Sequence, residues 1–169
     1  RMTAVSMALF DPVLDDERIV GPTGRAKQCP EIDVAGAPVS DELRKWLLRS
    51  ETSDDDDVDE TAKPVDLNLP GNAEDELLFR LFSLLAEGGP FAQPDLEVRP
   101  YLAATKALYR DVARVYRRRE DDAVMIANDA YEVTGCFDKP RPLQRCIVVT
   151  EPKKSLAIVV YSPAKGMWG

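Results

Sequence analysis

The chain has 169 residues, 44% of them hydrophobic, which is ordinary for a globular protein and enough for one domain with a core. Its net charge of −8 disfavours non-specific binding of the whole chain to nucleic acid or to an anionic membrane. The charge is uneven, with −12 in residues 1–99 and +4 in residues 100–169. One interpretation is that the two halves attract each other or bind partners of opposite charge. The other is that the asymmetry is surface charge without a role.

Catalytic and metal-binding residue types are scarce. The sequence contains no histidine, which removes the usual general base and the commonest metal ligand. It has no phosphate-binding loop and no dinucleotide-binding glycine motif. Three widely spaced cysteines, Cys29, Cys136 and Cys146, favour reduced thiols in an intracellular compartment over a disulfide framework or a zinc site, and one bridge between two of them is the alternative. We therefore predict a chain that is not an enzyme and that has no metal or cofactor; an enzyme without histidine is the alternative.

The N-terminal third is interrupted by turn-forming residues. Residues 1–10 lack acids and contain Arg, Ser and Thr, a composition found in organelle transit peptides, so a plastid or mitochondrial interior is one interpretation of an otherwise soluble intracellular chain. Residues 11–39 hold four prolines and three glycines, which block long regular elements. We predict that residues 1–49 form an extended arm with a short strand at 31–36 and one helix at 40–49, capped by Ser40.

An acidic segment follows at 50–64. It includes four consecutive aspartates and offers almost no apolar surface to bury, so we predict a flexible linker. Three hydroxyl residues in it precede acids and resemble sites of acidophilic kinases, although a plain solvated linker explains the same residues. These candidate phosphorylation sites are Ser50, Thr52 and Ser53.

The segment NAEDELLFRLFSLLAEGGP, residues 72–90, predicts a helix over 73–87 that is apolar around roughly 220° of its circumference. A surface helix needs a stripe only somewhat wider than about 100°, so this helix must be covered on several sides, by its own chain or by a partner. We predict partner binding here through six side chains: Leu77, Leu78, Phe79, Leu81, Phe82 and Leu85.

A second long helix is predicted over 100–119, beginning at Pro100 and ending in arginines. Four arginines lie mostly along one side of it and form a candidate site for an anion or an acidic partner: Arg110, Arg114, Arg117 and Arg118. Such a cluster binds phosphates, an acidic protein, or carboxylates of its own chain. A third helix is predicted over 121–133, ended by Gly135.

The C-terminal part changes to β-branched residues. Two apolar runs around the sequence EPKK predict a β-hairpin over 145–162, and because apolar residues are consecutive, we expect both of its faces to be covered. Cys136, before a proline-rich turn, is either a reactive thiol, the attachment point of a linear tetrapyrrole or, as we favour, a small core residue. Cys146 lies in the predicted strand and is expected to be inert.

These elements together predict an α+β fold, with about three helices packed on a small sheet that includes a C-terminal hairpin, in a compact domain over 65–169. No family is identified from these residues. We predict a non-catalytic structural or assembly subunit of a larger complex, which binds protein partners through the helix at 73–87 and the N-terminal arm. Binding of nucleic acid or nucleotide phosphate through residues 110–119 is the alternative, and no transmembrane segment is expected.

Overall fold

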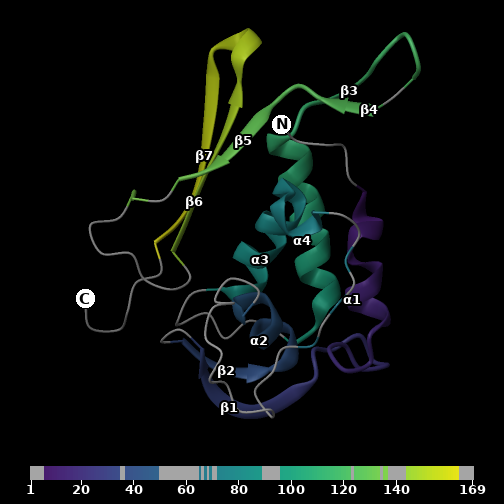
Figure 1. Cartoon of the computed structure of the whole chain (residues 1–169), viewed down its shortest axis with the longest axis vertical. Helices are drawn as coiled ribbons and strands as arrows, with labels where there is room; N and C mark the ends of the chain where they lie inside the picture. The colour runs from purple at the N-terminus through teal and green to yellow at the C-terminus, as the bar shows by residue number, and fades with distance from the viewer. Residues whose placement is uncertain are drawn as a thin grey trace.

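The computed structural model describes residues 6–34, 37–49, 65, 67, 69, 72–88, 96–122, 124–133, 135–136 and 144–163. The fold class is α+β, as predicted, with four α-helices and three small antiparallel sheets in the described residues (Figure 1). The helices are α1 (Asp11–Asp15), α2 (Glu42–Arg49), α3 (Leu77–Glu87) and α4 (Val98–Val112). The strands are β1 (Gln28–Val34), β2 (Ala37–Asp41), β3 (Val115–Arg117), β4 (Val124–Ile126), β5 (Asp129–Glu132), β6 (Gln144–Glu151) and β7 (Leu156–Pro163).

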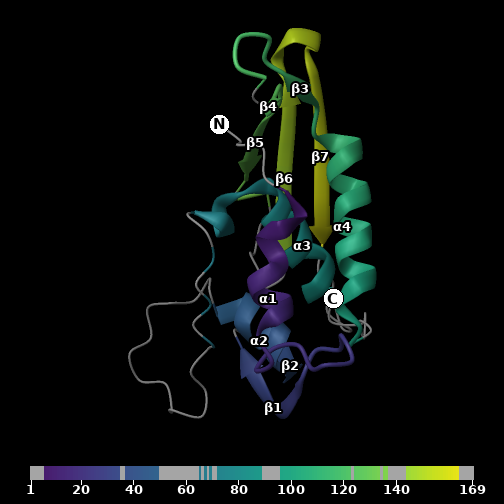
Figure 2. The ribbon, with the colours of Figure 1, turned by 90° about the vertical axis from the view of Figure 1, so that its right-hand side faces the viewer.

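The molecule is elongated. The β1–β2 hairpin and α2 lie at one end, the sheets built from β3 to β7 lie at the other, and α1, α3 and α4 lie between them (Figures 1 and 2). Because α3 lies between the two ends, it is in position to contact both.

The N-terminal residues are not a simple extended arm. A 3-10 turn, Met7–Phe10, leads directly into α1, with Pro12 in the first turn of that helix. Phe10 and Val13 are each 1% exposed, and the Phe10 ring lies 4.7 Å from that of Phe82. The turn-forming residues keep the helix to five residues, as expected, but the apolar side chains between them anchor the segment in the core.

The strand predicted at 31–36 is confirmed over residues 31–34 as part of β1, while residues 35–36 lie outside the described residues, and the helix predicted at 40–49 is confirmed as α2 over Glu42–Arg49. The cap of α2 differs from the prediction, because the Arg44 N–H donates to Asp41 Oδ1 at 2.9 Å while Ser40 belongs to β2. Leu43 and Leu47 are each 1% exposed. The helix therefore contributes its predicted apolar stripe to the core.

Helix α3 is the central core helix, and its wide apolar arc faces two separate hydrophobic clusters. Leu78, Phe79 and Phe82 pack with α1, α2 and the start of α4. Leu77 and Leu81 pack with α4, β6 and β7. Two stripes directed at two clusters together account for the width of the apolar arc.

Helix α4 ends earlier than predicted, at Val112, and the segment expected to be a third helix forms strands. Ala113 takes an extended backbone conformation, and the Arg114 N–H donates to Asn128 Oδ1 at 2.5 Å. Residues 124–126 then pair with β3, and residues 129–132 pair with β6. The helix predicted over 121–133 is therefore wrong, because pairing with the strongly β-forming β6 overrides the local preference of this segment.

The predicted C-terminal hairpin is confirmed as β6 and β7, joined by residues 152–155, one position later than expected. Strand β5 adds to the other edge of β6, which gives the order β5-β6-β7. Alternate residues of the three strands point to opposite faces. The inner face contributes Ile147, Val149, Ile158 and Val160 to the cluster with α3 and α4.

Candidate functional site

In the described part of the chain, the outer face of the β5-β6-β7 sheet is apolar and largely exposed on its edge strands, contrary to the expectation that both faces of the hairpin are covered. Strand register places Tyr131, Val148 and Val159 in one row across the three strands. The next row holds Val133, Cys146 and Tyr161, since the Val133 N–H donates to the Cys146 carbonyl at 2.8 Å. We call the outer apolar face the set Tyr131, Val133, Val148, Val159 and Tyr161.

The side chains of the edge strands are strongly exposed. Tyr131 is 56% exposed, Val159 58% and Tyr161 53%, whereas Val148 on the middle strand is half-buried between its neighbours. The third row of this face holds Asp129 of β5, Thr150 of β6 and Ala157 of β7, and its first two residues are polar. A contiguous patch of aromatic and β-branched side chains on a sheet is typical of an interaction surface.

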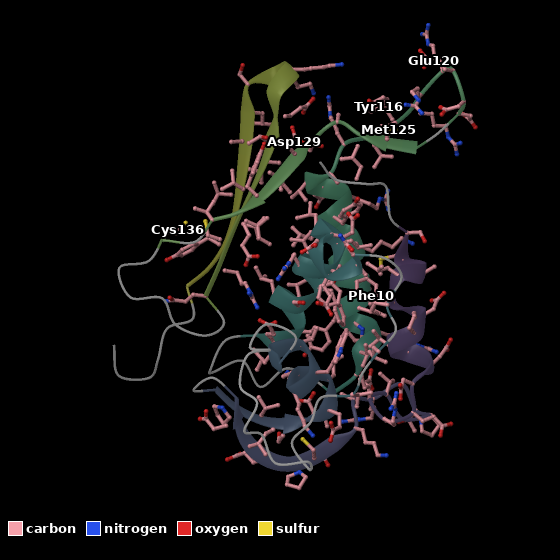
Figure 3. All side chains as sticks on the ribbon, viewed as in Figure 1. Phe10, Tyr116, Glu120, Met125, Asp129 and Cys136 are labelled. Carbon is pink, nitrogen blue, oxygen red and sulfur yellow. The ribbon has the colours of Figure 1, made fainter. Side chains whose placement is uncertain are left out.

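A second exposed apolar element lies beside this sheet. The β3–β4 ribbon projects from the body of the molecule, and Figure 3 labels Tyr116 and Met125, which face each other across it. Val115 is 54% exposed and Tyr116 49%. A two-stranded ribbon has only marginal stability by itself. Its exposed side chains add to the apolar surface at this end of the molecule.

The four arginines predicted to bind an anion are not on one helix. Arg110 is exposed on α4, while Arg114 lies after the helix and Arg117 in β3. Arg114 pairs with Glu151 at 3.0 Å and Arg117 with Asp122 at 2.8 Å. The remaining residue, Arg118, pairs with Asp121, and that hydrogen bond raises the pKa of the guanidinium.

Because three of the four arginines are held by carboxylates of the same chain, the structure supports the intrachain interpretation of this cluster. The early end of α4 is the physical reason, since it distributes the four side chains over a helix, a loop and a ribbon instead of one helix face.

The six side chains predicted to bind a partner through α3 lie in or near the core of their own chain. Five of them are at most 3% exposed and Leu85 is half-buried. The five are Leu77, Leu78, Phe79, Leu81 and Phe82. The prediction that they form a surface needs correction, because the two clusters on either side of α3 already cover them.

A network of ion pairs joins α3 to the sheet. Arg145 of β6 is held 3.2 Å from Glu87 at the end of α3 and 3.4 Å from Glu132 of β5. Arg80 of α3 lies 3.7 Å from the same Glu132 and 3.6 Å from Asp75. The Glu87 side chain is only 1% exposed, so this network fixes the sheet on the helix through a buried charge.

Within the described residues, no group of three or more Cys, Asp or Glu side chains is placed to hold a metal ion. No helix of the described part is long and apolar enough to cross a membrane. The candidate phosphorylation sites Ser50, Thr52 and Ser53, and the acidic linker at 50–64, lie outside the described residues. The sequence pattern missed the outer apolar face, because consecutive apolar residues do not reveal which face of a sheet is covered.

Comparison with known proteins places the chain in one family. Residues 1–165 match the model of the family described as cilia- and flagella-associated protein 300. A protein of that name from Paramecium tetraurelia is 26% identical over 168 residues, which cover 98% of this chain and 62% of the relative. Its counterpart from Chlamydomonas reinhardtii is 24% identical over 172 residues, which cover 96% of this chain and 63% of the relative.

The chain thus spans less than two thirds of the length of these relatives. No solved structure matches it significantly. Since the family model covers nearly all of the sequence, the chain belongs to the cilia- and flagella-associated protein 300 family.

Proposed function

We propose that this chain is a non-catalytic structural or assembly subunit of a multiprotein complex of cilia or flagella, and that it binds a protein partner through the outer apolar face. The observation that carries the proposal is the row Tyr131, Val148 and Val159, together with the neighbouring Tyr161, which is apolar and largely exposed. The family name supports the ciliary setting. The relatives give no support to a plastid or mitochondrial interior.

The chemistry of the face favours a protein over other occupants. The three rows across β5, β6 and β7 hold no lysine or arginine, and Asp129 is their only charged residue. Nucleic acids and anionic lipids are bound by basic side chains, so this face suits neither. Exposed aromatic and β-branched side chains on a surface that lacks basic groups are instead typical of a protein interface.

The size of the face sets the kind of interface. With strands about 4.8 Å apart and residues about 3.4 Å apart along a strand, the three rows span roughly 250 Å² in projection. A stable interface uses about 800 Å² per partner, so the outer apolar face is the core of a larger contact. Val115 and Tyr116 on the β3–β4 ribbon are further exposed apolar side chains at the same end of the molecule. A homodimer built on this face alone would be too small to be stable.

The test compares two variants in the ciliated cells that contain this protein. The double variant Val159→Thr with Tyr161→Thr makes the outer face more polar and places β-branched threonines, which suit strands, at both positions. The control is Leu156→Thr, because Leu156 is 49% exposed on the same strand but alternates to the other face. We expect native size-exclusion chromatography and native mass spectrometry to find the wild type and the control in a defined assembly.

The double variant should run as the free polypeptide, with its affinity lowered by about tenfold or more for each hot-spot side chain removed. A wild-type chain that runs alone in extracts contradicts the subunit role. A double variant that stays in the assembly contradicts the choice of this face.

A further inference from the structure

Cys136 and Cys146 are brought together at the end of the β5–β6 pair. Cys146 lies in β6 and is 6% exposed, and its backbone carbonyl accepts the N–H of Val133 at 2.8 Å. The chain then turns back at Gly135, whose φ of +91° suits glycine. Cys136 follows and is exposed (Figure 3).

Two hydrogen bonds made by Val133 bring Cys136 close to the strand that carries Cys146. The Cys136 thiol donates to the carbonyl of Val133 at 3.5 Å, which holds its sulfur beside the strand pair. The neighbouring Cys136 thiol, together with burial, raises the pKa of Cys146. The pair therefore consists of one thiol open to solvent and one buried thiol on the neighbouring strand.

The third cysteine is far from this pair. Cys29 lies in β1, at the opposite end of the molecule, and it is half-buried. Burial raises the pKa of its thiol, so it is a poor nucleophile near neutral pH. All three cysteines are free thiols in this structure, and Cys29 serves as an internal reference for accessibility.

We infer that Cys136 and Cys146 form a dithiol site that a hydroperoxide converts to an intramolecular disulfide. The exposed Cys136 sulfur attacks the hydroperoxide and becomes a sulfenic acid, while the other oxygen leaves as an alcohol, or as water when the oxidant is hydrogen peroxide. The Cys146 sulfur then attacks the Cys136 sulfur, and the sulfenic hydroxyl leaves with the Cys146 proton as water. Two thiols lose two electrons in total, and a dithiol reductant reverses the reaction by thiol–disulfide exchange.

The new bond has a position that matters for the outer apolar face. Cys146 shares a row with Val133 and Tyr161, so the disulfide tethers the segment after β5 against one edge of that face. The inference itself does not rest on the proposed function, because it concerns two sulfurs of this chain and a small oxidant.

The experiment treats the full chain with a small excess of hydrogen peroxide at neutral pH and counts thiols with a maleimide under denaturing conditions. The reduced chain has three reactive thiols. We expect the oxidised chain to keep one thiol, to lose about 2 Da in intact mass, and to yield a peptide that joins Cys136 to Cys146. Dithiothreitol should restore all three thiols.

Variants separate this site from ordinary thiol oxidation. Cys29→Ser should leave the disulfide unchanged, whereas Cys136→Ser should prevent the mass loss and keep both remaining thiols reactive. Because Cys136 is exposed, its serine variant should fold normally, which circular dichroism checks. Three surviving thiols, a disulfide-linked dimer through Cys136, a bridge to Cys29, or a Cys136 sulfinic acid without a bridge would each overturn the inference.

Discussion

Replacing Arg145 by methionine tests whether the buried ion pairs hold the C-terminal sheet on α3. Methionine keeps an unbranched side chain, so the change removes the charge more than the packing. Arg145 Nη2 lies 3.2 and 3.3 Å from the two carboxylate oxygens of Glu87, and its own side chain is only 11% exposed. The variant leaves the Glu87 carboxylate, 1% exposed, without this guanidinium.

The magnitude follows from that burial. Removing one partner of a buried ion pair costs about 3–5 kcal/mol, because the remaining charge stays out of water. Domains of this size are stable by only about 5–15 kcal/mol, so the variant should lose a large share of its stability. At roughly 2–4 °C per kcal/mol for a domain of this length, its Tm should fall by about 6–20 °C.

The assay is urea unfolding at pH 7, followed by circular dichroism. The matched control is Arg18→Met, because the pair between Arg18 and Asp16 is exposed, with the arginine side chain 63% accessible. Exposed pairs contribute about 0–1 kcal/mol, so the control should change little. Adding Glu87→Gln to Arg145→Met should recover part of the loss, since neither position of this pair then carries a charge. A loss below about 1 kcal/mol for Arg145→Met, or no recovery in the double variant, would refute the reasoning.

Three further outcomes are expected. Leu78→Ala and Leu81→Ala, one for each cluster on α3, should each cost about 2.7–5 kcal/mol in one shared unfolding transition; two separate transitions would show that the clusters fold independently. Burial raises the pKa of Tyr109 from 10 to about 12, and its hydroxyl has no hydrogen-bond partner among the described residues, so stability should be full below pH 10 and fall as pH rises towards 12, a loss that Tyr109→Phe should remove in pH-dependent urea titrations. The Cys136–Cys146 disulfide closes a short loop and should add about 3 kcal/mol, measured as the difference between the oxidised and reduced urea midpoints; an unchanged or lower oxidised midpoint would contradict this.

The sequence predicts those helices and strands that have a clear pattern of apolar residues within one segment. The apolar arc at 73–87 predicts α3, and two β-branched runs predict β6 and β7, because the spacing of apolar residues reflects which sides of an element are buried. The same patterns do not say which other residues bury those sides. The apolar side chains of α3 belong to the core because they pack in two hydrophobic clusters. Both clusters are built from contacts between residues far apart in the chain.

Other elements depend on tertiary contacts that a local pattern does not contain. The segment DDAVMIANDAYEV predicts a helix. In the structure, Asp122 adopts a φ of +54° in the turn between β3 and β4, which pair as an antiparallel ribbon. The following residues are then held by their ladder with β6. The N-terminal residues were expected to extend across a surface because proline and glycine are frequent, but Phe10 is buried against α3.

The candidate site likewise depends on tertiary contacts that the local sequence pattern does not contain. The most apolar segment of the sequence predicts the interaction surface on α3, whereas exposed apolar side chains lie on β5 and β7, where Ala130, Ile158 and Val160 are only partly buried. Strand register separates the two sets, and register is fixed only when the sheet is packed on α3 and α4. Cys136, expected in the core, is exposed for a similar reason, since a turn at Gly135 places it at the end of the strand pair.

The central claim, that the outer apolar face binds a protein, is tested most directly by hydroxyl-radical footprinting of the native assembly against the free chain. Tyr131 and Tyr161 are 56% and 53% exposed in the free chain, so both should be labelled readily. In the assembly, we expect labelling of both tyrosines to fall several-fold, while Leu156, 49% exposed and alternating to the other face of the same strand, stays labelled. Equal labelling of Tyr131 and Tyr161 in the two states would contradict the account, because a docked partner must cover them.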